Sequence, residues 1–387
     1  MRSQTLRARS LSNLATDPDL RPTWSSESTA ARDFTFHQLA PYIGRMKTSM
    51  ARSFIQAQTA EGDLVVDPFS GCGTVALEAA AVGRRVIAGD WNPYAVLLTR
   101  AKLFAPIDLL RAQRRLRKVW ALSRERLVQQ DLRTVPSWVR SFFNPETLRS
   151  ALAFRDVCVE VSDDFLLACL LGILHHQRPG FLSYPSSHLV PYLRDRKYPA
   201  TAYPELYRAR DVLTRLEAKL ERTYRRPPVR HRESHRVFQG DARAFPRAQG
   251  IRAVITSPPY MNELDYVRDN RLRLWFIQKS LPTAIELEGR NREASFTALM
   301  RSVCGRLAPC IERGGYFTLV VGDATRGGGK AGRTAVLLED LFNTDPALHS
   351  FMLDRVYVDT IPDIRRSRRE CRGTKTETVL IYQKSAP

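Results

Sequence analysis

The chain has 387 residues, enough for one catalytic domain with a full hydrophobic core and an insertion. Its 60 basic and 40 acidic residues give a net charge of +20, which favours a polyanionic partner and salt-sensitive binding. The six cysteines include no Cys-x-x-Cys pair, so we expect no zinc knuckle, no disulfide framework and a reducing cytoplasm. The sequence starts with polar residues, so we expect no signal peptide. The longest apolar run, 165–174, is too short to span a bilayer, so we expect no membrane partner.

Residues 1–35 are polar and poorly patterned, and we expect a mobile segment there. Further along, an apolar run at 64–66 precedes the sequence Asp-Pro-Phe-Ser-Gly-Cys-Gly-Thr at 67–74 and an alanine-rich run at 75–81. This order predicts a strand, a glycine turn that a ligand can approach closely, and a helix. Ala76 stands where a dinucleotide fingerprint has its third glycine, and no Gly-Lys-Ser/Thr follows. The pattern therefore argues against a nicotinamide or flavin dinucleotide site, and it is not a P-loop.

Three further predicted strands end in polar residues. The strand at 85–88 leads to Asp90, the strand at 236–239 leads to Asp241, and the strand at 253–256 leads to Ser257. Ligands of open α/β sheets bind at the carboxyl ends of the strands. A series of polar strand ends at one edge therefore predicts a binding site there.

The last of these strands stops at Ser-Pro-Pro-Tyr, residues 257–260. Two consecutive prolines remove two N–H donors, so neither a central strand nor an ordinary helix can continue through them. Rigid carbonyl acceptors beside an aromatic ring can bind the exocyclic amino group of a flipped-out base. An isolated Pro-Pro usually marks a simple turn, but the glycine turn upstream favours the functional interpretation.

Residues 104–236 separate the second predicted strand from the third and hold 25 basic and 14 acidic residues. Helical spacing at 109–130, 165–176 and 206–224 predicts a helical insertion. The loop 178–199 contains both basic and aromatic residues, which are the types needed to bind phosphates and to recognise bases. We interpret the insertion as the target-recognition region; the alternative is a helical cap that shields the cofactor. Its histidines lack acidic or thiol partners at ligand spacing, so we expect no metal.

The residues that we expect to contact a nucleic acid lie in this loop and in a second basic cluster near the C-terminus. They are Ser187, His188, Arg194, Arg196, Lys197, Arg365 and Arg366.

Beyond residue 260, the pattern predicts a packed helix at 262–277, a fifth strand at 316–321, a glycine-rich loop at 327–330 that could close over substrate, and a final strand at 378–383. The fold class is therefore α/β. We expect a doubly wound, mostly parallel sheet with helices on both faces and an antiparallel final strand, formed by residues 36–103 and 237–387 around the insertion.

Residues 67–74 and 256–260 together resemble the S-adenosylmethionine-dependent amino-methyltransferases of DNA. Ser257 most resembles the cytosine-N4 branch, since the adenine-N6 branch more often has Asp or Asn there. Residues 36–54 resemble the family's amino-terminal cofactor-contacting segment. The resemblance implies a seven-stranded class I methyltransferase sheet, S-adenosyl-L-methionine as cofactor and double-stranded DNA as partner. It also implies a nucleoid-associated prokaryotic protein, with a restriction endonuclease of the same system as a further partner. The order of the motifs favours a monomer or loose dimer.

The resemblance also assigns roles. The turn would form a floor under the methionine part, with Asp67 accepting from its ammonium group; Asp90 would hold the ribose hydroxyls and Asp241 the adenine amino group. The implied cofactor-binding residues are Asp67, Pro68, Phe69, Gly71, Gly73, Thr74, Asp90, Trp91, Asp241 and Ala242. The implied catalytic residues are Ser257, Pro258, Pro259 and Tyr260. Ser257 and the Pro258 carbonyl would accept from the target amine, and Tyr260 would stack on the base. Adenine-N6 methylation, RNA amine methylation and a non-catalytic binding subunit remain the alternatives.

Overall fold

The computed structural model describes residues 33–176, 180–185, 197–229, 231, 234–259, 269–279, 292–322, 333–360 and 376–385. At its centre is a seven-stranded sheet with the order β3-β2-β1-β4-β5-β7-β6. Strand β7 runs antiparallel to both of its neighbours, and the other four pairs are parallel. This is the strand order of the class I, Rossmann-like methyltransferase fold, so the predicted fold class is confirmed.

The strands are β1 (Leu64–Asp67), β2 (Arg85–Asp90), β3 (His235–Gln239), β4 (Ile251–Thr256), β5 (Ile311–Gly322), β6 (Phe351–Thr360) and β7 (Thr376–Lys384). Strand β1 is buried along its whole length, as expected of a central parallel strand with both faces covered. The chain order reverses between β1 and β4, and ligands of doubly wound sheets bind at such a switch point.

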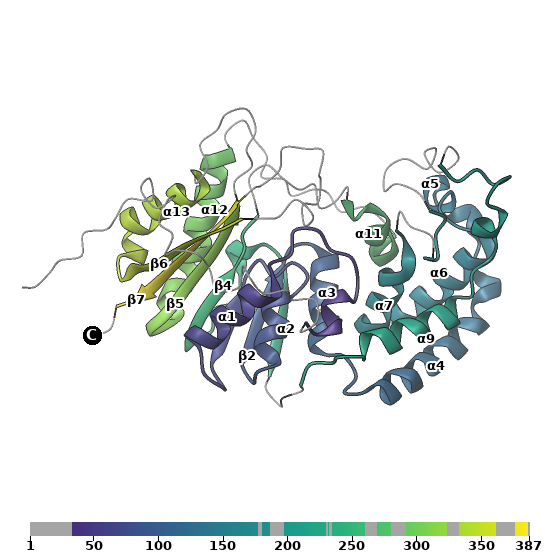
Figure 1. Ribbon diagram of the computed structural model, residues 1–387, viewed down its shortest axis with the longest axis horizontal. Coiled ribbons are helices and arrows are strands. Elements are labelled where there is room, and N and C mark those ends of the chain that lie inside the picture. Colours follow the sequence, from purple (N-terminus) through teal and green to yellow (C-terminus); the bar gives the residue numbers. More distant parts are fainter. Residues whose placement is uncertain are drawn as a thin grey trace, which may run out of the picture.

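Helices cover both faces of the sheet (Figure 1). On one face lie α1 (Thr48–Gln58) and α2 (Thr74–Ala80), which pack on Val65 and other residues of the same pleat. On the other face lie α12 (Arg292–Leu307) and α13 (Arg333–Thr344), which pack on Val66 and its pleat. Because successive side chains of a strand point to opposite faces, neighbouring valines of β1 serve two separate cores.

The insertion follows α3 (Pro93–Leu103) and stands beside the sheet as a stack of helices (Figure 1). These helices are α4 (Leu109–Glu125), α5 (Ser137–Arg140), α6 (Pro145–Glu160), α7 (Asp164–Leu174) and α9 (Val212–Thr223). Helices were predicted in the regions of α4, α7 and α9. The helix α6 was not, because its apolar residues are interrupted by charges on a helix with little amphipathic contrast.

One element after β4 belongs to the core of the insertion. Helix α11 (Arg271–Gln278) buries Leu274, Trp275 and Phe276 among residues of α6 and α7. Arg155 of α6 donates from Nε to the carbonyl of Phe276 at 2.6 Å and from Nη2 to that of Ile277 at 2.7 Å. The predicted helix at 262–277 is thus confirmed for its second half, and residues 261–268 lie outside the described residues.

No helix in the described ranges is both long enough and apolar enough to cross a membrane. Within the same ranges, no group of three or more histidine, cysteine and acidic side chains is arranged to hold a metal ion.

Candidate functional site

The glycine-turn motif and the proline motif meet at the ends of β1 and β4. Thr256 is the last residue of β4, and its Oγ1 donates to Oδ1 of Asp67, the last residue of β1, at 2.6 Å. The same Oδ1 accepts from the backbone N–H of Phe69 at 3.3 Å. The other oxygen, Oδ2, accepts no hydrogen bond from any residue that the structure describes. The two motifs, 189 positions apart, therefore share one buried hydrogen bond.

The environment of Asp67 makes its charge responsive near neutral pH. Only 3% of the residue is exposed, and burial raises the pKa of its carboxyl to about 7 even though Thr256 and the Phe69 amide stabilise the anion. The negative charge of Asp90 acts in the same direction as burial. A cation that binds at this carboxylate would lower its pKa and release a proton.

Asp90 ends β2 and is held by the backbone. Its Oδ2 accepts from the N–H of Gly71 at 2.9 Å, and its Oδ1 accepts from the N–H of Asn92 at 2.9 Å. Burial raises the pKa of this carboxyl to about 6, and the backbone amides oppose that effect. The side chain remains partly exposed, as does Trp91 beside it. A fixed, largely ionised carboxylate at a strand end is a suitable acceptor for vicinal hydroxyl groups.

The two glycines of the turn meet different needs. Both adopt left-handed backbone, with φ of 49° at Gly71 and 72° at Gly73. A Cβ at Gly73 would lie 2.7 Å from Oγ1 of Thr99, so packing against α3 requires this glycine. A Cβ at Gly71 would lie 3.3 Å from the ring of Tyr42, in the amino-terminal segment. The structure therefore places Gly71 against that segment and Gly73 against α3.

The remaining residues of the turn are enclosed. Pro68 and Thr74 are buried, and Phe69 is partly buried against the core under α12 and α13. Thr74 begins α2, and its Oγ1 lies 3.7 Å from Sγ of Cys72, which is also buried. These residues support the turn from behind, and of the four only Phe69 reaches the surface in part.

Asp241 lies near Asp90, because the N–H of Gly240 donates to the Asp90 carbonyl at 3.1 Å. Its carboxylate is already engaged: Oδ2 accepts from Nε of Arg243 at 2.9 Å, and this pairing lowers the pKa of Asp241. Ala242 beside it is buried. An adenine amino group could bind Asp241 only beside or in place of this exposed arginine.

The proline motif continues directly from β4. Ser257 is partly exposed, Pro258 is buried and Pro259 is partly exposed. Tyr260 lies outside the described residues. Among the residues expected to contact DNA, Lys197 is exposed, with Nζ 5.5 Å from the centre of the Tyr198 ring. The others also lie outside the described residues: Ser187, His188, Arg194, Arg196, Arg365 and Arg366, as does the loop at 327–330.

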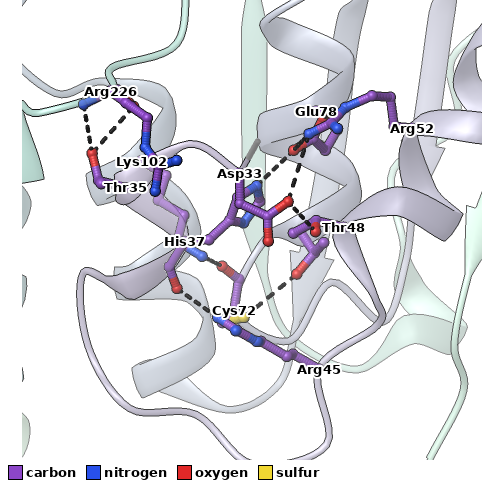
Figure 2. Close-up of polar contacts among 11 residues, drawn as sticks. Asp33, Thr35, His37, Arg45, Thr48, Arg52, Cys72, Glu78, Lys102 and Arg226 are labelled. Carbon is purple, nitrogen blue, oxygen red and sulfur yellow. Dashed lines mark hydrogen bonds and ion pairs between the residues drawn. The ribbon is translucent and has the colours of Figure 1, made fainter. Parts of the chain in front are cut away.

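Sequence reasoning missed a buried polar cluster behind the turn, shown in Figure 2. Glu78 of α2 accepts from Nε2 of His37 at 2.7 Å and from Nε of Arg52 at 2.9 Å. Glu78 is 1% exposed. A glutamate in a helix usually faces solvent, and the only available signal was its place inside an alanine-rich helix with no polar face.

A family model described as DNA methylase matches residues 14–100, which include the turn, Asp90 and most of α3. No curated protein matches the chain. Among solved structures, TrmN from Thermus thermophilus is similar at 13% identity and a TM-score of 0.36, over 90% of this chain and 52% of that one. This chain thus spans about half the length of TrmN.

Two other solved structures match along nearly their whole length. An rRNA methylase from Streptococcus thermophilus has 11% identity and a TM-score of 0.34, over 88% of this chain and 98% of that one. SMU.1697c from Streptococcus mutans, in complex with SAH, has 9% identity and a TM-score of 0.33, over 88% and 98%. The strand order and the matched DNA-methylase model together indicate a methyltransferase whose cofactor is S-adenosylmethionine.

Proposed function

We propose that this protein transfers a methyl group from S-adenosylmethionine to the exocyclic N4 amine of a flipped-out cytosine in double-stranded DNA. The hydrogen bond between Thr256 and Asp67 is the observation that carries the proposal. It brings the residues that follow β4 next to the end of β1, at the edge where ligands of such sheets bind. The expected cofactor residues and the expected target-amine residues therefore come from neighbouring strand ends at one edge of the sheet.

The residues at this edge fit the cofactor. Oδ2 of Asp67, which accepts from none of the described residues, suits a cationic amino group, because an ammonium would stabilise the anion that burial disfavours. The partly exposed carboxylate of Asp90 suits the ribose hydroxyls. When bound, S-adenosylmethionine supplies an electrophilic methyl group on its sulfonium.

The chain's own contribution is to position and activate the amine. An exocyclic aryl amine is a poor nucleophile because its lone pair is delocalised into the ring. Ser257 Oγ and the carbonyl of Pro258 accept hydrogen bonds from its two N–H groups and so localise that pair, and Pro259 keeps the carbonyl rigid. Orientation of the amine toward the methyl group supplies much of the rate. Tyr260 stacks on the base at about 1–3 kcal/mol, which offsets part of the extrusion cost.

The charge of the insertion supports a polyanionic partner. Helix α4 contains six cations and one acid, Glu125. Arg111 pairs with Asp108, and Arg115 pairs with Asp163. The other four cations of α4 are exposed and make no ion pair with any residue that the structure describes: Arg114, Arg117, Lys118 and Arg124. Exposed cations without an acidic partner, placed along one helix, suit a phosphate backbone.

Nucleoside mass spectrometry tests the function directly. DNA is taken from a host that lacks methylation of both bases and expresses the wild type, Tyr260→Ala or Tyr260→Phe. We expect N4-methylcytosine with the wild type, less with the phenylalanine variant and none with the alanine variant. N6-methyladenine instead would keep the mechanism and overturn the assignment based on Ser257. If neither base is modified, RNA becomes the substrate to test, and a binding subunit without turnover is the remaining alternative.

A further inference from the structure

The cluster behind the glycine turn contains a carboxylate that cannot touch a ligand. Glu78 is 1% exposed, and its Oε1 accepts from His37 Nε2 at 2.7 Å and from Arg52 Nη2 at 3.1 Å, while Oε2 accepts from Arg52 Nε at 2.9 Å (Figure 2). Burial alone would raise the pKa of Glu78, but these hydrogen bonds outweigh it and lower the pKa below its usual value. Burial lowers the pKa of His37, so the histidine is neutral and donates from Nε2.

Such an arrangement is costly unless its partners are in place. Removing one partner of a buried charge leaves it uncompensated, which costs several kcal/mol. Both partners of Glu78 come from outside its own helix: His37 lies in a 3₁₀ turn, Thr35–Gln38, and Arg52 lies in α1. Asp33 accepts from Thr48 at 2.6 Å and extends the cluster along the same segment. The charge on Glu78 therefore depends on how the amino-terminal segment docks on α2.

The docked segment reaches the cofactor side of the turn. After His37, whose carbonyl accepts from Arg45 at 2.8 Å, the chain passes Pro41, whose carbonyl accepts from the Tyr94 hydroxyl at 2.7 Å. Tyr42 follows and lies against Gly71. The N–H of Gly71 is the donor that fixes the Asp90 carboxylate. A continuous set of contacts thus runs from Glu78 to Asp90.

The insertion holds the same segment from its other side. Lys219 of α9 donates to the carbonyl of Gln38 at 2.8 Å, and Thr35 Oγ1 donates to the carbonyl of Thr223 at 2.6 Å. A Cβ at Gly172 of α7 would lie 2.1 Å from the carbonyl of Leu39, so the segment crosses that helix in close contact. Residues 35–39 are therefore packed between α2 and the insertion. On the α2 side, the charged residue that contacts this segment is Glu78, through His37.

We propose that Glu78 is a positioning residue of the cofactor site, which sets cofactor affinity by fixing the segment that carries Tyr42 against Gly71. This inference rests on the proposed function only in that the cofactor is S-adenosylmethionine. Glu78 itself acts from behind the turn and makes no contact with the cofactor.

The test compares two polar residues that are both buried, Glu78 and Gln58. Glu78→Gln keeps the shape, but its amide N–H groups face the guanidinium donors of Arg52. Gln58→Met is the matched control: it removes the hydrogen bonds between Gln58 and Thr318, 2.7 and 2.9 Å, which join α1 to β5 and do not involve the segment that carries Tyr42. Calorimetric titration with S-adenosylhomocysteine gives the Kd of each protein, and urea unfolding gives its stability.

We expect the Kd of Glu78→Gln to rise about tenfold, with that of Gln58→Met unchanged at comparable loss of stability. The amide resonance of Gly71 should shift in the first variant and not in the second. Wild-type affinity in Glu78→Gln, or an equal loss in Gln58→Met, would overturn the proposal. If Glu78→Gln does not fold, the same measurements are made on Arg52→Gln, which removes the half-buried partner of Glu78 instead. A wild type that binds no S-adenosylhomocysteine would refute the proposed function itself, and this inference with it.

Discussion

Replacing Asp67 with asparagine separates the charge of this side chain from its hydrogen bonds. An asparagine Oδ1 can still accept from Thr256 and from the Phe69 amide, so the junction of β1 and β4 is kept. What disappears is a carboxyl whose pKa burial raises from 3.8 to about 7. At about 1.4 kcal/mol per pH unit, that shift corresponds to about 4 kcal/mol that ionised Asp67 costs the folded protein.

The sign of the pH dependence follows from proton binding. Folded Asp67 holds its proton up to a pH of about 7, whereas in the unfolded chain it loses the proton near 3.8. The folded state therefore binds more protons within that window, and its stability falls as the pH rises through it. Asparagine has no such titration. We expect Asp67→Asn to gain stability relative to the wild type from pH 5 to pH 8, and to gain most above pH 7.

Cofactor binding should move in the opposite direction. In the proposed function the deprotonated carboxylate pairs with the ammonium of the cofactor, so we expect wild-type affinity for S-adenosylhomocysteine to increase as the pH rises from 6 to 8. Asp67→Asn should bind weakly and without that dependence. The measurements are urea unfolding and calorimetric titration at each pH, with Asp108→Asn as control, since that variant keeps the capping bond to the Arg111 amide. A stability difference between Asp67→Asn and wild type that stays constant across pH would refute the reasoning.

Three further variants test the junction of the motifs, the glycine turn and the basic face of α4. Thr256→Val removes the donor to Asp67 and should lower kcat/KM about tenfold, because a hydrogen bond to a charged group is worth about 1.5–3 kcal/mol; an unchanged value would mean that the hydrogen bond between the two motifs is not needed. Gly73→Ala should destabilise by about 1–3 kcal/mol beyond Gly62→Ala in urea unfolding, because both have positive φ but only Gly73 meets Thr99; equal destabilisation would contradict this. Changing Arg114, Arg117, Lys118 and Arg124 of α4 to glutamine should reduce the slope of log Kd against log salt for duplex DNA, by about 0.9 for each phosphate that the helix no longer neutralises, and an unchanged slope would remove α4 from the DNA interface.

Those parts of the fold that local sequence determines could be predicted. Apolar β-branched runs identified β1, β2 and β4, and the glycines identified the turn, since backbone with positive φ restricts residue choice. Strand β6 was missed because it lies at the sheet edge and carries exposed residues such as Met352 and Arg355. Its sequence lacks the continuous apolar run that marks a buried strand.

The site was predictable only in part, for a different physical reason. Acids at strand ends can be read from strand boundaries, because topology alone brings them to one edge. The state of each acid depends on partners far along the chain: Thr256 for Asp67, and His37 and Arg52 for Glu78. Asp241 differs, because Arg243, which lowers its pKa, lies two residues along the chain, whereas Thr256 lies 189 positions from Asp67.

The way the insertion is attached bears on its role. A cap that only shields a cofactor needs contacts with one rim of the site. Here the insertion holds the amino-terminal segment through Lys219 and also holds α11, the helix after the proline motif, through Arg155. The insertion therefore contacts both the segment expected to border the cofactor and the helix that follows the expected target-amine motif. A region that reads DNA must bring the target base to the methyl donor, and attachment to both sides gives it the means to do so. The attachment thus favours target recognition over simple shielding.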